Sequence, residues 1–247
     1  MSGIDASTDE EEVAALRRLL SSGPRTQRQR PAALSPDKQA KDVLGDSQAT
    51  AQHLLQLLQD KSGLDQAEPM LKQEMERRKK LLGADNAEAL LSVTCYAMLL
   101  QAKGEHAKAL PLYREALQGF EKRYGPAHRD TLISVNNLAV LLKSMGNLSE
   151  ARPLYERVLA GDEAQLGPDH PHTLDSIYNL ARLMQADGDL AGAIKLFERE
   201  LAGCAQQYGP DHNETRTSAM NLRGVCMETG NTQRAQQLTE QFKLEKL

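Results

Sequence analysis

The chain has 247 residues, a net charge of −4 and a mean hydropathy of −0.53. Leu and Ala supply 38 and 30 residues, whereas Val and Ile together supply only 11, and Trp does not occur. Because unbranched apolar side chains suit helices, while β-branched and aromatic ones suit sheets, this composition predicts an all-α protein. The acidic balance offers no basic surface for nucleic acid, and no apolar run reaches the ~20 residues of a membrane helix.

The first 46 residues differ in composition from the rest of the chain. They contain three prolines, no aromatic residue and separate blocks of acidic and basic residues. Such a segment buries too little apolar surface to offset the entropy lost on ordering, so we expect residues 1–46 to be a disordered tail. Within it, residues 11–20 are a candidate short amphipathic helix. The acidic start argues against a signal or transit peptide, and three widely spaced cysteines favour a cytoplasmic protein.

From residue 47 onward the sequence repeats itself every 42 residues. A fixed period of this length is typical of proteins built from stacked structural units. Four ladders of identical residues share the period: Gly83, Gly125, Gly167 and Gly209; Gly104, Gly146, Gly188 and Gly230; Ala109, Ala151, Ala193 and Ala235; Leu112, Leu154, Leu196 and Leu238.

Each 42-residue unit is predicted to form two helices. In the second copy, apolar residues at spacings of three and four predict a first helix from Asp130 to Ser144 and a second from Ser149 to Leu166. Gly146 is expected to adopt the left-handed conformation just after the first helix. Gly167 is expected to end the second helix, and Pro168 prevents its continuation.

The loop between units carries residues that suit the start of the next helix. Asp169 and Asp211 are expected to cap that helix, because their side-chain oxygens can accept hydrogen bonds from free backbone N–H groups. Histidines also recur in this loop. Stacking separates equivalent residues of successive pairs by about the width of two helices, at ~10 Å per helix, so these side chains cannot share one metal ion. We expect local capping or packing instead. They are His128, His170 and His212.

The pairs must stack, because one helix pair cannot bury both of its apolar faces. We expect an α-solenoid of about five antiparallel helix pairs, over residues 47–82, 83–124, 125–166, 167–208 and 209–247. The first pair is atypical, with a degenerate first helix over residues 47–61 and Gly63 in its loop. The last helix, from Thr232 to about Glu245, carries a polar face typical of a cap, so we expect the array to finish there.

One segment of the repeat resembles a known family. Residues 136–157 read N-N-L-A-x-L-L-x-x-x-G-x-x-x-E-A-x-P-L-Y-x-R, a pattern that resembles the tetratricopeptide repeat. The 42-residue period resembles the long-helix form found in kinesin light chains and nephrocystin-3-like proteins. The resemblance implies a right-handed superhelix whose first helices line a concave groove. Residues 1–46 are too short for the heptad-repeat helix of kinesin light chains, so we do not expect a motor subunit.

The resemblance also implies a binding site on the first helices. An asparagine at one position in these repeats often holds a ligand's backbone, and it corresponds here to Asn137, Asn179 and Asn221. A carboxamide offers both a donor and an acceptor, which suits an extended peptide. The alternative is that these side chains bond within the superhelix. Helical spacing places further candidate residues on or near the same surface: Asn136, Val140, Lys143, Tyr178 and Arg182.

No catalytic arrangement is apparent in the sequence. Phosphate-binding glycine loops, nucleophile elbows and zinc-binding spacings do not occur, so we expect no enzyme, no cofactor and no metal site. The sequence therefore favours a scaffold or adaptor whose groove binds a peptide or helix from a protein partner, with no nucleic acid and no membrane. The alternative is a structural subunit held in a larger assembly by its convex or terminal surfaces. Self-association remains open.

Overall fold

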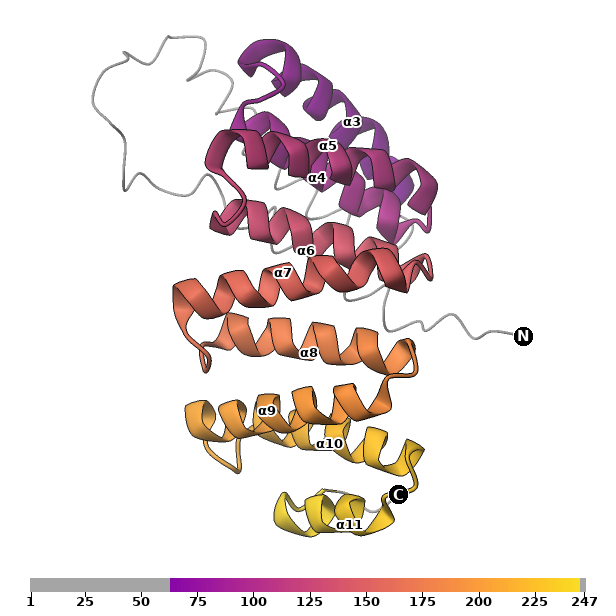
Figure 1. The fold of residues 1–247 in the computed structure, drawn as a ribbon. Helices are drawn as coiled ribbons and strands as arrows, with labels where there is room; N and C mark the ends of the chain where they lie inside the picture. Colours follow the sequence, from indigo (N-terminus) through magenta and orange to yellow (C-terminus); the bar gives the residue numbers. More distant parts are fainter. Residues whose placement is uncertain (1–62, 245–247) are drawn as a thin grey trace. The chain divides into compact units, whose positions relative to one another are not determined.

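A computed structural model describes residues 63–244, and every regular element in that range is a helix (Figure 1). The all-α prediction is therefore confirmed for the described residues. The expected tail over residues 1–46, its candidate helix at 11–20 and the degenerate helix at 47–61 lie outside the described residues.

The structure divides into two compact units, and the described part of the first covers residues 63–123. This part contains α3 (Gly63–Leu82), α4 (Ala87–Ala102) and most of α5 (His106–Tyr124). Helix α3 packs against α4. The Tyr113 hydroxyl of α5 donates a hydrogen bond of 2.9 Å to Gln101 of α4. Gly63, expected in a loop, is instead the buried first residue of α3.

The second unit spans residues 124–247 and contains three helix pairs. Each helix packs against the next one in the chain. The first pair confirms the predicted bounds to within one residue, whereas the last helix ends at Gln241, earlier than expected. The helices are α6 (Arg129–Ser144), α7 (Leu148–Leu166), α8 (Pro171–Ala186), α9 (Leu190–Tyr208), α10 (Asn213–Glu228) and α11 (Thr232–Gln241).

Histidine, and not aspartate, caps the first helix of each pair in the second unit. The ring Nδ1 of His128, His170 and His212 accepts a hydrogen bond of 3.1–3.2 Å from the backbone N–H two residues later. The expected caps at Asp169 and Asp211 were wrong, because each aspartate lies one residue before the cap position. The positive φ predicted for Gly146 is confirmed at +79°, and Gly167 ends α7 as predicted, with a φ of +91°.

Removing a histidine cap should destabilise the second unit modestly. We expect His170→Ala to lower the free energy of unfolding by about 1 kcal/mol, because the backbone N–H of His172 loses its acceptor. His170→Asn should retain most of the stability, since Asn86 already caps α4 through its side-chain oxygen. Chemical denaturation of the three proteins measures the difference. Equal losses for both substitutions would show that the cap is not the cause.

A further glycine ladder lies where the two helices of a pair cross. A Cβ atom added to Gly161 on α7 would lie 2.5 Å from Leu132 Cδ1 on α6, and one added to Gly203 on α9 would lie 2.4 Å from Leu174 Cδ2 on α8. Gly119 meets Leu90 in the same way. These glycines are 42 residues apart and let the helices approach closely. The alanine ladder is likewise fully buried.

Candidate functional site

The predicted binding residues all lie on the first helices of the three pairs in the second unit. Each of them is partly or fully exposed. We call the exposed stripe that they form on α6, α8 and α10 the first-helix surface. It carries Asn136, Asn137, Val140 and Lys143 from α6, Tyr178, Asn179 and Arg182 from α8, and Asn221 from α10.

Polar contacts join neighbouring helices along this surface. The Arg129 guanidinium of α6 lies 3.2 Å from the ring Nε2 of His172 on α8. The Gln185 side-chain amide of α8 donates a hydrogen bond of 2.6 Å to Glu228 of α10. Arg182 in turn donates one of 2.9 Å to Gln185. The three helices are therefore adjacent, and the first-helix surface is continuous across them.

The asparagine ladder has unused hydrogen-bonding capacity. The structure records no hydrogen bond between the side chain of Asn137, Asn179 or Asn221 and any other described residue. Two other predicted binding residues, Asn136 and Tyr178, are more closely packed within the fold. The Asn136 Oδ1 atom is buried and accepts no hydrogen bond from the described chain, and the Tyr178 ring packs against Phe197 of α9 at 6.2 Å between centroids.

Helix α10 adds an apolar part to this surface that the sequence interpretation missed. Met220 and Met227 are 45% and 44% exposed, and a Cβ on Gly224 between them would meet nothing within 4 Å. These residues occupy the repeat positions of Asn136, Val140 and Lys143, so the 42-residue register could have identified them. Flexible methionine side chains beside an open glycine suit contact with an apolar group.

The cysteines and histidines do not form a reactive site. Cys95, Cys204 and Cys226 are buried free thiols. Burial raises the pKa of Cys95 and of Cys204 to about 12, so both stay protonated and unreactive at neutral pH. Between residues 63 and 244, no three His, Cys, Asp or Glu side chains are grouped in a way that could hold a metal ion.

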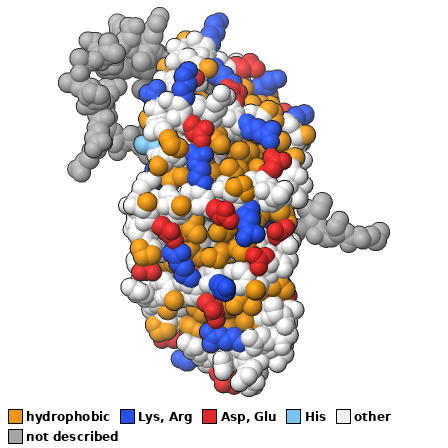
Figure 2. All heavy atoms as spheres, viewed as in Figure 1, with side chains coloured by type: hydrophobic (Ala, Val, Ile, Leu, Met, Phe, Trp, Pro, Cys, Tyr) orange, Lys and Arg blue, Asp and Glu red, His pale blue; other side chains and the backbone are white. Residues whose placement is uncertain are grey.

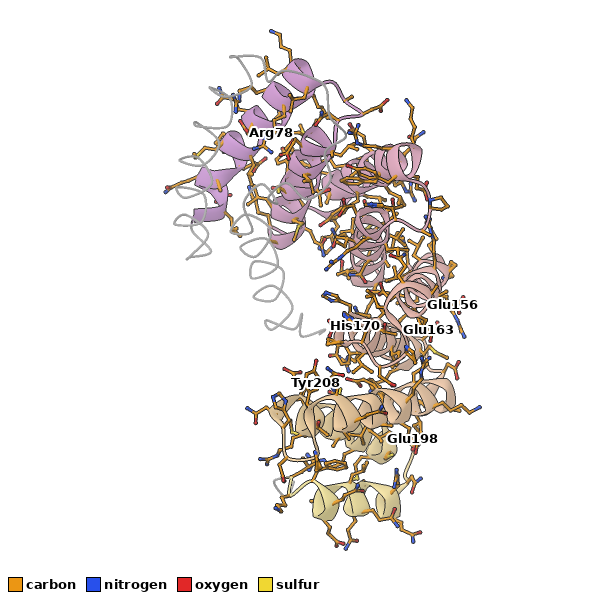
Figure 3. The ribbon with its side chains drawn as sticks, turned by 90° about the vertical axis from the view of Figure 1, so that its left-hand side faces the viewer. Arg78, Glu156, Glu163, His170, Glu198 and Tyr208 are labelled. Carbon is orange, nitrogen blue, oxygen red and sulfur yellow. The ribbon has the colours of Figure 1, made fainter. Side chains whose placement is uncertain are left out.

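The second helices of the pairs, α7, α9 and α11, form a different surface. Ion pairs join α7 to α9 and α9 to α11. Arg199 of α9 pairs with Glu163 of α7 at 2.6 Å, and Arg234 of α11 pairs with Glu198 of α9 at 3.6 Å. Figure 3 shows Glu163 and Glu198 away from His170 and Tyr208, which lie near the loops. Basic and acidic side chains are interspersed on the face drawn in Figure 2. That face shows no large area of one charge.

None of the described helices is both long and apolar enough to cross a membrane. A pocket in the first unit is lined by residues 82–86 and Arg123, and none of the predicted binding residues lines it.

Comparison with known proteins identifies the family. The tetratricopeptide repeat model matches residues 87–164, 136–204 and 173–241, which together cover more than half of the chain. The chain therefore belongs to the tetratricopeptide repeat family, whose members typically act as protein–protein interaction scaffolds. A comparison with curated proteins finds no match.

Solved structures support the same assignment. The chain is similar to tetratricopeptide-like repeats of a kinesin light chain candidate from Podosopora anserina, with 27% identity and a TM-score of 0.72 over 79% of this chain and 92% of that one. It is also similar to BtubC (BKLC) from P. vanneervenii, with 18% identity and a TM-score of 0.70 over 96% and 87% of the two chains. This second likeness concerns the fold alone.

Proposed function

We propose that this tetratricopeptide repeat protein is a non-catalytic scaffold whose first-helix surface binds an extended peptide segment of a protein partner. The asparagine ladder carries the proposal. Asn137, Asn179 and Asn221 are exposed in part, lie on adjacent helices and make no hydrogen bond to other described residues. A carboxamide without an internal partner can donate to a peptide carbonyl and accept from a peptide N–H.

The unbonded carboxamides of the ladder favour an extended peptide over a helix. An extended peptide leaves its backbone N–H and C=O groups free to bond a carboxamide, whereas the backbone amides of a helix are already bonded internally. Three buried free thiols favour a reducing compartment such as the cytoplasm.

Affinity purification of cellular partners tests this function. The double substitution Asn137→Ala with Asn179→Ala should reduce recovery of the bound partner about tenfold or more, because two hydrogen-bonding side chains are lost from the ladder. The matched control is Gln206→Ala with Gln207→Ala, two exposed amides on α9. Circular dichroism should show both variants folded.

The same experiment separates the alternative function. Unchanged recovery of the partner with the asparagine variant would contradict binding at the first-helix surface. If charge substitutions at exposed residues of α9 and α11 then released the partner, the protein would be a structural subunit held by its second-helix surface.

A further inference from the structure

A buried carboxylate lies beneath the first-helix surface where packing alone would use an apolar side chain. Glu200 of α9 is only 7% exposed, and its Oε2 atom has no hydrogen-bond partner in the described chain. The two preceding copies have Ala116 and Val158 at the same repeat position, and both are buried. An unpartnered buried charge is costly, and among the described residues the Ser218 hydroxyl of α10 is the neighbour that favours the charged form of Glu200.

Two further carboxylates lie near Glu200 on the helices that cover it. Asp175 of α8 and Glu214 of α10 are close enough for each to raise the pKa of the Glu200 carboxyl. Both side chains are exposed. The structure records no lysine or arginine paired with any of the three within residues 63–244. The one recorded contact to a basic group is with the His172 ring, 3.8 Å from Asp175.

These carboxylates lie on the same helix faces as the asparagine ladder. Asp175 precedes Asn179 by four residues, and Glu214 precedes Asn221 by seven, spacings that place each pair on one face of its helix. Arg182, seven residues after Asp175, is exposed on the same face of α8. The ladder is therefore bordered by charged groups of both signs: Asp175 and Glu214 lie with Arg129 towards the starts of the helices, and Arg182 lies with Glu228 towards their ends.

We infer that Asp175 and Glu214, above the buried Glu200, bind a lysine or arginine side chain of the partner peptide. The inference rests on the proposed function and names a specificity for that surface. An ammonium or guanidinium group supplies the donors that these carboxylates lack, and a charge-assisted hydrogen bond is stronger than a neutral one.

A peptide array tests this specificity directly. The immobilised probes are N-acetylated nonapeptide amides whose central residue is arginine, lysine, citrulline, leucine or glutamate, with the other positions randomised over Ala, Ser, Asn and Gly. Citrulline has nearly the shape of arginine without its charge. We expect arginine and lysine probes to retain about tenfold more protein than citrulline probes. The variant Asp175→Asn with Glu214→Gln should abolish this difference, and Asp187→Asn, an exposed acid at the other end of α8, should preserve it.

The outcomes separate this inference from the function on which it rests. Equal retention of arginine and citrulline probes would overturn the cationic specificity. If the Asn137→Ala, Asn179→Ala variant then still retained less of every probe, the asparagine ladder would bind peptides without a preference for a cationic side chain. If retention depended on neither set of residues, both proposals would be wrong.

Discussion

Replacing Glu200 by glutamine should stabilise the second unit at pH 8 by on the order of 3 kcal/mol and have little effect at pH 4. Burial, assisted by the Asp175 and Glu214 carboxylates, raises the pKa of Glu200 from 4.5 to about 7. The folded state therefore holds this proton more tightly than the unfolded state does. Stability is greatest below pH 4.5, falls as pH rises through 7, and is then constant with respect to this group.

Urea denaturation between pH 4 and pH 8 measures this effect. The Glu200→Gln protein should lose less stability than the parent chain between pH 4.5 and 7, because its residue 200 does not titrate. Glu198→Gln is the matched control on the same helix, since Glu198 is exposed and its pairing with Arg234 is worth under ~1 kcal/mol. If the two substitutions gave the same pH profile, Glu200 would not be the buried acid that the structure indicates.

Replacing Gly161 by alanine should lower the free energy of unfolding of the second unit by about 1–3 kcal/mol. The added Cβ would lie 2.5 Å from Leu132 Cδ1, and Leu132 is 3% exposed, so its side chain has little room to move. Alanine normally favours a helix over glycine by about 1 kcal/mol, and the clash must exceed that gain.

Replacing Gly224 by alanine, in the same unit, should have the opposite effect on the free energy of unfolding. Gly224 lies inside α10, and a Cβ there would meet nothing within 4 Å. We expect this substitution to stabilise the protein by about 0.5–1 kcal/mol. Thermal denaturation of both variants, followed by circular dichroism, gives the comparison. A stabilising Gly161→Ala would contradict the close crossing of α6 and α7.

The 42-residue period was sufficient to predict the helix pairs, because each ladder of identical residues marks a position with the same packing requirement in every unit. Gly146 and Gly167 could be placed from sequence, since the left-handed conformation strongly favours glycine. The caps could not be placed to the residue. Whether Asp169 or His170 faces the free N–H groups depends on the path of the loop, and a shift of one residue changes the side chain that reaches them.

The candidate surface was predictable to a similar degree. Helical spacing predicted that Asn137, Asn179 and Asn221 lie on the outer side of their helices, because the period of 3.6 fixes which residues share a face, and each is partly exposed in the structure. The sequence could not predict that their carboxamides make no hydrogen bond to other described residues, because that depends on the three-dimensional positions of their neighbours. Glu200 carried a sequence signal, a charge in a register occupied by Ala116 and Val158, but its neighbours come from helices that sequence spacing alone does not bring together.

Photo-crosslinking from the first-helix surface tests the central claim most directly. A benzoyl-phenylalanine at position 220, in place of the exposed Met220 beside Asn221, should cross-link the partner in cells. The same group in place of Lys195, exposed on α9, should not. Cross-linking of the partner from position 195 and not from position 220 would contradict binding on the first-helix surface.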